Sequence, residues 1–155
     1  MTTWHCQTFN ELSTQTLYDL LKLRSDVFVV EQNCIFPDMD DLDKLPKTRH
    51  LFALRDDKIV AYARLLAEGV SYSGYSSIGR VVVAQESRKD KLGHVLMTNA
   101  IKEILNLWPD SPIKIGAQSH LERFYLSHGF ITVSEPYMED GIEHYHMIRE
   151  AEINL

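Results

Sequence analysis

The chain has 155 residues, of which 45% are hydrophobic and 25% charged, and this length suits a single globular domain with a core of its own. Its net charge of −6 argues against nonspecific binding to nucleic acid or to an anionic membrane. No apolar run approaches the ~20 residues of a membrane span, and no signal peptide opens the chain. Two cysteines, Cys6 and Cys34, are too few for a disulfide scaffold. We therefore expect one cytoplasmic domain, residues 1–155, with reduced thiols.

The first elements in chain order are expected to be a strand and a long helix. The strand spans Trp4 to Phe9. Ser13 or Thr14 can cap a helix that runs towards Val30, because short hydroxyl side chains accept hydrogen bonds from the first free N–H groups of a helix.

Two charged residues of this helix, Arg24 and Glu31, fall on the same face as its apolar residues. Removing an unpaired charge from water costs several kcal/mol. These side chains are therefore expected either to form a structural ion pair or to line a cleft.

The middle of the chain is expected to contain an irregular segment and then a hairpin. Residues 32–47 are acidic and interrupted by Pro37 and Pro46, which is typical of a rim or substrate loop. His50–Leu54 and Ile59–Leu66 are predicted strands, joined by a short polar turn at residues 56–57.

The stretch from residue 77 to 107 organises the rest of the chain. Val81–Val83 is a continuous β-branched run, which predicts a buried strand. A basic loop follows, and then an apolar stripe from Leu92 to Leu107 predicts an amphipathic helix. The free N–H groups and positive dipole end of a helix bind phosphate well, and Gly93 would let a ligand approach this backbone.

The charge of this loop agrees with a phosphate site. Between residues 80 and 94 four basic residues stand against two acidic ones, a balance of +2 on an acidic protein. A polyphosphate cofactor would bind such a patch, whereas the alternative is an ordinary solvated helix start.

The pattern of the C-terminal third predicts a strand, a helix, a second strand and a hairpin after the long helix. The helix ends at residues 108–110, where Trp-Pro-Asp interrupts it. The expected elements that follow are a strand at Ile113–Ala117, a helix at Ser119–His128 closed by Gly129, a strand at Phe130–Val133 and a hairpin around Asp140-Gly141. The order βα, ββ, βα, βα, ββ indicates an α/β fold, a mixed sheet with helices packed against it.

Two motifs carry a resemblance to a known family. Arg88-x-x-Lys91-x-Gly93 resembles the pyrophosphate loop of the GNAT acyltransferases, with lysine where that family has its first glycine. Gln118 followed by Tyr125-x-x-x-Gly129-Phe130 resembles a second GNAT segment. Together with T-R-H-L, F-V-V-E-Q and E-D-G-I-x-H, these motifs make nearly the whole chain similar to the ElaA-like branch of the GNAT N-acetyltransferases.

The resemblance implies a fold and a cofactor. The GNAT fold has a mixed, mostly antiparallel central sheet flanked by helices, and two of its strands, here Arg80–Val83 and Ile113–Ala117, splay to admit acetyl-CoA. Tyr125 stands where the family has the general acid that protonates the departing thiolate. The cofactor-binding residues implied are Val81, Val82, Val83, Arg88, Lys89, Asp90, Lys91, Leu92, Gly93, His94 and Gln118.

The acceptor side is expected to be shaped by Arg24, Phe28 and His50, with Glu31 as a catalytic residue. Deprotonating an alkyl ammonium of pKa ~10.4 at pH 7 costs about 4.6 kcal/mol, which is small enough for a carboxylate or a histidine acting through water. Glu31, His50 and Glu139 are the candidates for this base. We expect no metal site, because the pair formed by residues 144 and 146 lacks a third ligand at a convincing spacing.

The sequence therefore predicts an acetyl-CoA-dependent N-acetyltransferase that transfers acetyl directly to a small-molecule or peptide amine. An acyltransferase similar to the acyl-homoserine lactone synthases is one alternative, because R-x-x-V-F-V-V-E-Q resembles the N-terminal part of those enzymes. A non-catalytic acyl-CoA-binding module is another, because the glycine loop departs from the family pattern. Turnover with an amine panel and dependence on acyl-carrier protein separate these three hypotheses.

Overall fold

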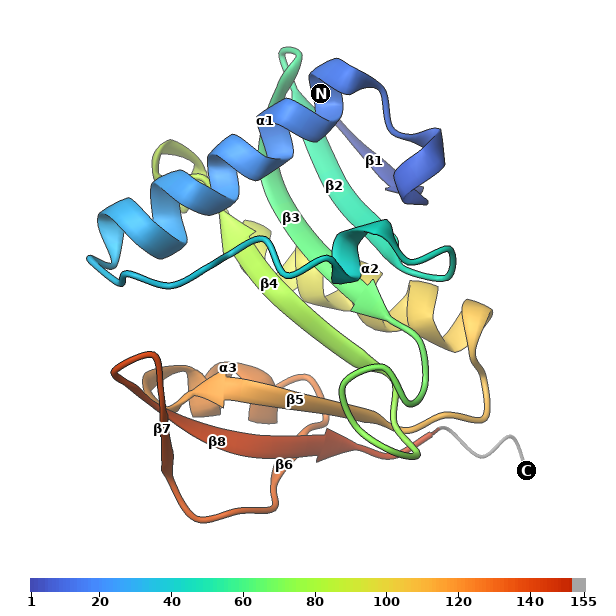
Figure 1. The fold of residues 1–155 in the computed structure, drawn as a ribbon, viewed down its shortest axis with the longest axis vertical. Helices are drawn as coiled ribbons and strands as arrows, with labels where there is room; N and C mark the ends of the chain where they lie inside the picture. Colours follow the sequence, from blue (N-terminus) through green and yellow to red (C-terminus); the bar gives the residue numbers. More distant parts are fainter. Residues whose placement is uncertain (152–155) are drawn as a thin grey trace.

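Two antiparallel sheets form the framework of the computed structural model, which describes residues 1–151 (Figure 1). The first sheet has the strand order β1-β2-β3-β4, and the second has β5-β8-β6 with β7 paired to β8. The strands are β1 (Thr2–Gln7), β2 (Arg49–Arg55), β3 (Lys58–Leu66), β4 (Ser77–Val83), β5 (Ile113–Gln118), β6 (Ile131–Thr132), β7 (Tyr137–Glu139) and β8 (Ile142–Arg149).

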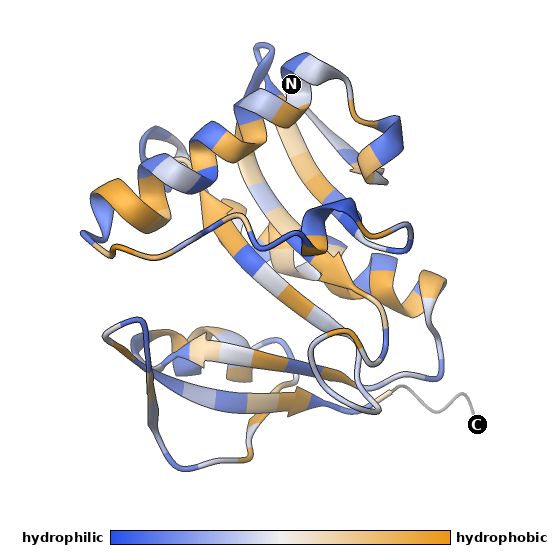
Figure 2. Cartoon of the chain, viewed as in Figure 1, coloured by the Kyte–Doolittle hydropathy of each residue, from blue (hydrophilic) through white to orange (hydrophobic). Residues whose placement is uncertain are grey.

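Helices cover both faces of the first sheet. Helix α1 (Thr14–Arg24) crosses one face and α2 (Leu92–Leu107) lies behind the other, while the short α3 (Glu122–Leu126) packs on the second sheet (Figure 1). Polar and apolar residues alternate along α1, as expected of a helix with one buried face (Figure 2). None of the helices within residues 1–151 is long and apolar enough to cross a membrane.

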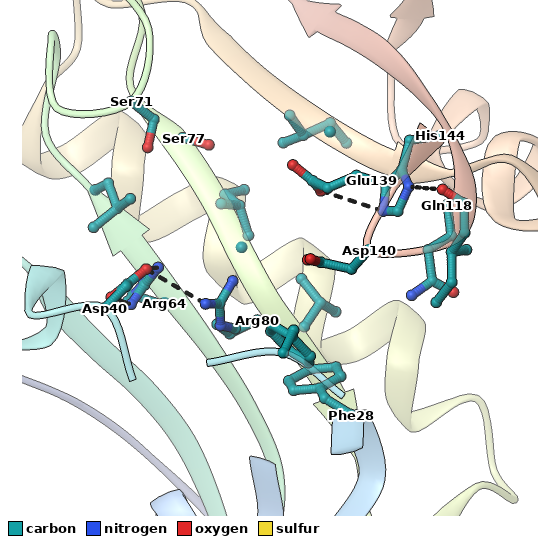
Figure 3. Close-up of a pocket in the computed structure, with 18 of the residues that line it drawn as sticks. Phe28, Asp40, Arg64, Ser71, Ser77, Arg80, Gln118, Glu139, Asp140 and His144 are labelled. Carbon is teal, nitrogen blue, oxygen red and sulfur yellow. Dashed lines mark hydrogen bonds and ion pairs between the residues drawn. The ribbon is translucent and has the colours of Figure 1, made fainter. Parts of the chain in front are cut away.

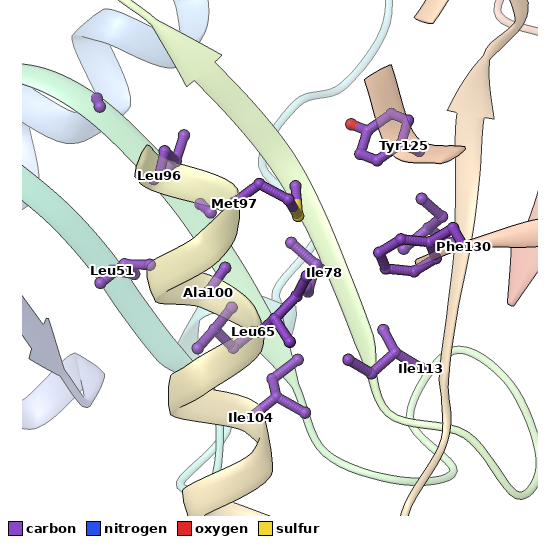
Figure 4. Packing of buried hydrophobic residues seen from close by; sticks show 14 of the residues in the cluster. Leu51, Leu65, Ile78, Leu96, Met97, Ala100, Ile104, Ile113, Tyr125 and Phe130 are labelled. Carbon is purple, nitrogen blue, oxygen red and sulfur yellow. The ribbon is translucent and has the colours of Figure 1, made fainter. Parts of the chain in front are cut away.

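Successive side chains of a strand point to opposite faces of the sheet, so each strand contributes to the apolar clusters on both faces. Phe52 of β2 belongs to the apolar cluster under α1, whereas its neighbours Leu51 and Ala53 belong to the cluster under α2. The α2 cluster also includes Ile113 of β5 and Phe130, so it joins the two sheets (Figure 4).

The elements predicted in chain order are present, but several have other bounds. The first strand lies at Thr2–Gln7 instead of Trp4–Phe9, and the helix predicted at Ser119–His128 is a 3-10 turn at Ser119–Leu121 followed by α3. The first helix also differs. Ser13 caps α1 by accepting a hydrogen bond from the Thr16 N–H at 3.0 Å. The chain then continues from Ser25 to Glu31 as a π-helical segment, η2. The N–H of Gln32 donates to the Val27 carbonyl at 3.0 Å, five residues back, which is the π-helical pattern. The wider turn rotates Glu31 relative to Arg24, and the two side chains do not meet.

Both predicted hairpins are present with left-handed residues at their turns. Asp56 and Asp57 have φ of 53° and 61° in the β2–β3 turn, and Asp140 and Gly141 have φ of 50° and 78° in the β7–β8 turn. Positive φ at both central residues gives the turn a twist that matches the flanking strands. Cys6 and Cys34 are free thiols, as expected.

The two sheets touch where β4 and β5 begin and then part. The Ser76 N–H donates to the Pro112 carbonyl at 3.0 Å, and the Lys114 N–H donates to the Ser76 carbonyl at 2.9 Å. Within residues 1–151 no strand pairs with this edge of β4 beyond that point. The predicted splayed strand pair is thus confirmed. The prediction of one domain also covered residues 152–155, which lie outside the described residues.

Candidate active site

A cavity of about 290 Å³ opens where β4 and β5 separate. Its walls come from both strands, from η2 with the loop that follows it, and from the β7–β8 hairpin (Figure 3). The lining includes Phe28, Val81, Gln118, Tyr125, Glu139 and His144. One opening therefore brings together segments from both halves of the chain.

Tyr125 is the buried phenol of this cavity. Its ring packs edge-on against Phe124 and Phe130, with ring centroids 5.1 and 5.9 Å away, and only 7% of the residue is exposed. Burial raises the pKa of Tyr125 to about 12, so the phenol keeps its proton at neutral pH. None of the hydrogen bonds within residues 1–151 involves its hydroxyl. A neutral hydroxyl is thus available to a ligand in the cavity.

The loop between β4 and α2 presents unpaired backbone donors. The N–H groups of Lys89, Asp90 and Lys91 donate to no acceptor in the described part of the chain. Asp90 and Lys91 have φ of 67° and 57°, so Lys91 adopts the left-handed conformation that favours glycine. These amides adjoin the first turn of α2, where helical N–H groups are free. The donor set suits an anion.

Arg88 of this loop is bound to η2. Its guanidinium donates to both carboxylate oxygens of Glu31, at 2.7 and 3.0 Å, and its Nε donates to the Val83 carbonyl at 3.1 Å. Glu31 does not line the cavity. The catalytic contact expected of Glu31 is therefore not made in this structure, because the carboxylate points to the phosphate loop instead.

Arg24 and His50 also lie outside the cavity lining, which corrects their expected contact with the acceptor. Both residues have no exposed surface. Arg24 donates to Asp38 at 2.9 Å and to Asp43 at 2.7 Å, which is the structural alternative that the sequence left open, with partners from the following loop.

His50 has both ring nitrogens engaged. Its Nε2–H donates to the Asp43 carbonyl at 3.0 Å, and its Nδ1 accepts from the Tyr62 hydroxyl at 2.6 Å. Desolvation lowers the pKa of His50, so the ring is neutral. A neutral ring without a free nitrogen cannot act as a base, which corrects the candidacy of His50.

The ion pairs continue from this buried cluster to the cavity wall. Arg64 donates to Asp40 at 2.7 Å and to Asp43 at 3.0 Å, and Arg80 lies 2.8 Å from Asp38. Arg80 also lies 3.4 Å from Asp40 (Figure 3). Asp40, Arg64 and Arg80 line the cavity. Sequence reasoning missed these three residues, although the acidic cluster of the loop was a sign that cationic partners would be needed.

Other predicted residues lie at or near the opening. Phe28, Val81 and Gln118 line the cavity, whereas the side chain of Val82 is buried on the α1 face. His94, at the start of α2, shares a hydrogen bond of 2.9 Å with His128. The roles of these residues remain predictions.

The comparisons with known proteins agree with this architecture. A family model described as an acetyltransferase (GNAT) domain matches residues 39–151. Protein ElaA of Escherichia coli K12 is 45% identical over 151 residues, which cover 97% of this chain and 98% of that protein. The crystal structure of Escherichia coli ElaA superposes with a TM-score of 0.90 at 44% identity, covering 97% and 100% of the two chains.

Two further crystal structures show how far the likeness extends. An acyl-CoA N-acyltransferase from Pseudomonas aeruginosa has a TM-score of 0.89 at 44% identity, covering 95% of this chain and 99% of its own. BjaI, a CoA-dependent acyl-homoserine lactone synthase, has a TM-score of 0.76 at 18% identity, covering 98% and 84%. The second likeness is one of fold alone.

Proposed function

Because the chain belongs to the acetyltransferase (GNAT) family, we propose that it is an N-acetyltransferase that uses acetyl-CoA and transfers acetyl directly to an amine. The observation that carries this proposal is the position of Tyr125. A phenol with a free hydroxyl lines the cavity at the point where β4 and β5 part. A proton donor is needed there if a thiolate leaves.

The residues around the opening suit the two ends of the cofactor. The N–H groups of Lys89, Asp90 and Lys91, next to the dipole of α2, would hold the pyrophosphate. The unpaired edge of β4 at Val81–Val83 would bind the pantetheine arm through backbone hydrogen bonds. When bound, acetyl-CoA supplies the acetyl group as an activated thioester.

Tyr125 would then give its proton to the departing sulfur. A phenol of pKa about 12 transfers a proton to a thiolate of ordinary pKa ~8.5 at a cost of about 5 kcal/mol. The newly acylated nitrogen carries an excess proton that can return to the phenolate, so the cost is recovered within the same turnover. Direct transfer of this kind also depends on positioning, because two bound reactants react at high effective concentration.

The structure bears on the two alternative functions. Lys91 adopts a left-handed backbone conformation that glycine takes without strain, so lysine at this position is compatible with a glycine-type loop, which favours an enzyme over a non-catalytic module. The likeness to the acyl-homoserine lactone synthase extends to the fold at 18% identity and gives no support to its chemistry.

The test is release of free thiol from acetyl-CoA in the presence of alkylamines, polyamines, aminoglycosides and peptides. We expect turnover with at least one of these classes. Cofactor binding without turnover on any amine would identify a binding module instead. A requirement for acyl-carrier protein would identify a synthase-like enzyme, and so would acyl transfer from acyl-CoA to SAM, the molecule bound with isopentyl-CoA in the BjaI structure.

A further inference from the structure

Glu139, one of the candidate bases named from the sequence, lies beside His144 on the cavity wall, and no catalytic role was predicted for His144. Both residues line the cavity, Glu139 from β7 and His144 from β8 (Figure 3). The His144 Nε2 lies 3.5 Å from the Glu139 Oε2. His144 is 7% exposed, whereas 58% of the Glu139 side chain is exposed to solvent.

The hydrogen bonds of His144 define which of its nitrogens carries the proton. Its Nδ1 lies 2.7 Å from the Ile142 carbonyl, and a carbonyl can only accept, so Nδ1 must be protonated. In the neutral ring the lone pair is therefore on Nε2, the nitrogen that faces Glu139. A proton taken up on Nε2 would face the Glu139 carboxylate, 3.5 Å away.

The groups around His144 make this corner attractive to a cationic amine. Tyr137 stacks on the ring at a centroid distance of 5.8 Å, and desolvation raises the pKa of Tyr137 to about 12, so it is neutral. On the same strand, desolvation and then Lys114 lower the pKa of His146. The carboxylate of Asp140 also lines the cavity. The carboxylates of Glu139 and Asp140 thus stand on the same cavity wall as the His144 ring.

The remaining neighbours of His144 add no competing base. Gln118 lies opposite it in the β5–β8 register and carries no charge. The Cys34 thiol donates to the Asp140 carbonyl at 3.1 Å, so it is held as a donor. Tyr125, on the same cavity, stays protonated as described above.

We infer that His144 is the general base of the proposed reaction, that Glu139 stabilises its imidazolium, and that the acceptor is an amine bound as its ammonium ion. This inference rests on the proposed function. His144 Nε2 takes one proton from the ammonium, and the neutral nitrogen forms the N–C bond as the C–S bond breaks. The sulfur leaves with its electron pair and takes the Tyr125 proton. The second nitrogen proton restores the phenol, and His144 releases its proton to water.

Imidazole suits this role because it changes charge between pH 5 and 8, whereas only about one in 2,500 alkylamine molecules is neutral at pH 7. General base catalysis is typically worth about 10²–10⁴-fold. A base becomes unnecessary once the amine deprotonates in solution. The loss of kcat/KM in a variant that lacks the base should therefore become smaller as the pH approaches the pKa of the amine, ~10.4.

The first experiment compares His144→Asn with wild type on an amine that the wild type acetylates. Asparagine can still donate to the Ile142 carbonyl, so the local backbone contact is kept. We expect kcat/KM to fall about 10²–10⁴-fold at pH 7 and the deficit to shrink at least tenfold by pH 10. His146→Asn, the same change two residues along β8 and outside the cavity lining, should keep the wild-type pH profile.

An equal deficit of His144→Asn at pH 7 and pH 10 would mean a structural role and overturn the inference. Near-normal turnover by His144→Asn at pH 7 would overturn the inference as well. If the wild-type protein acetylates no amine, both the proposed function and the role of His144 as base are wrong. If His144→Asn is as active as wild type, only the role of His144 is wrong. Glu139→Gln should keep the fold and lower kcat/KM at pH 7, because the protonated ring of His144 then lacks the carboxylate beside it.

A second measurement is independent of turnover. In protein labelled with ¹⁵N histidine, His144 is assigned from the signals that His144→Asn loses. At pH 8 we expect a protonated Nδ1 and an unprotonated Nε2. A ring protonated on Nε2 alone would leave no lone pair towards the cavity and would overturn the assignment.

Discussion

At the scale of single residues, the hydroxyl of Tyr125 carries the proposed leaving-group step. Tyr125→Phe keeps the ring between Phe124 and Phe130 and removes only the proton donor, so the fold should survive. We expect kcat to fall about 10²–10⁴-fold while acetyl-CoA binding, measured by calorimetry, stays unchanged. A loss of less than about threefold at saturating substrate from pH 7 to 9 would remove Tyr125 from the role of acid.

Substitutions of Lys91 test whether the loop between β4 and α2 binds the pyrophosphate of acetyl-CoA. The left-handed backbone of Lys91, with φ of 57°, is one that glycine adopts without strain. Lys91→Gly should keep the affinity for acetyl-CoA within about tenfold, or 1.4 kcal/mol. Lys91→Val should bind more weakly, because a β-branched side chain disfavours this conformation. A thousandfold loss in Lys91→Gly would show instead that the lysine ammonium is an essential contact.

At the scale of elements, buried ion pairs attach the loop after η2 to the first sheet. Arg24→Met would leave Asp38 with Arg80 alone and Asp43 with Arg64 alone, and removing one partner of a buried pair typically costs about 3–5 kcal/mol. Urea denaturation should show this loss as a lower midpoint. A midpoint within experimental error of wild type would contradict the structural role of Arg24.

The same ion pairs predict acid sensitivity. Burial opposes ionisation of Asp43, but its hydrogen bond to Arg24 and the charges of Arg24 and Arg64 outweigh burial and lower its pKa. A pKa lowered by folding stabilises the protein above the unfolded value of ~3.9, and this contribution is lost as the pH falls through the folded value. Stability should therefore decline below about pH 5, and less steeply in Arg24→Met. Parallel declines would contradict the linkage.

The pair between Glu31 and Arg88 connects η2 to the phosphate loop. Both side chains are about one-third exposed or more, and such pairs contribute about 0–1 kcal/mol, so Glu31→Gln should leave the melting temperature nearly unchanged. The carboxylate occupies the edge of Arg88 that a phosphate would bind. We therefore expect the KM for acetyl-CoA to fall by up to about fivefold with kcat retained. A large fall in kcat at constant KM would restore a catalytic role for Glu31.

At the scale of the whole molecule, one apolar cluster spans both sheets. Leu51 of the first sheet, Leu96 of α2 and Ile113 of the second sheet belong to it (Figure 4). Domains that share a core unfold together. Calorimetry should therefore give one transition with equal calorimetric and van't Hoff enthalpies, and two separable transitions would contradict the prediction of a single domain.

The sequence predicted those features whose signals are local. The apolar period of α2, the residues of both turns and the cap of α1 each depend on neighbours within a few positions, and all three were found. The partners of Arg24 could not be predicted, because Asp38 and Asp43 approach it only after the loop folds back. The π-helical geometry of η2 also left no clear periodic signal.

The same distinction between local signals and long-range contacts holds for the residues of the candidate site. Motif spacing indicated Tyr125 and the phosphate loop, because their residues are close in sequence. The sequence reasoning favoured a strand-face or substrate-cleft position for His144 over a metal site, but assigned it no catalytic role, since its relation to Glu139 depends on how the β7–β8 hairpin faces β5. Arg64 and Arg80 were missed because their carboxylate partners lie 24 and 42 positions away.

The divergence of β4 and β5 has a consequence for self-association. An unpaired strand edge can recruit a strand from another chain and so start aggregation. Here the free edge of β4 faces the second sheet across the cavity, with β1 at the opposite side of its own sheet (Figure 1). The molecule thus keeps an open row of backbone groups for a narrow ligand while denying that row to a second polypeptide. Selectivity against strand addition follows from where the edge points, and not from a proline, which β4 lacks.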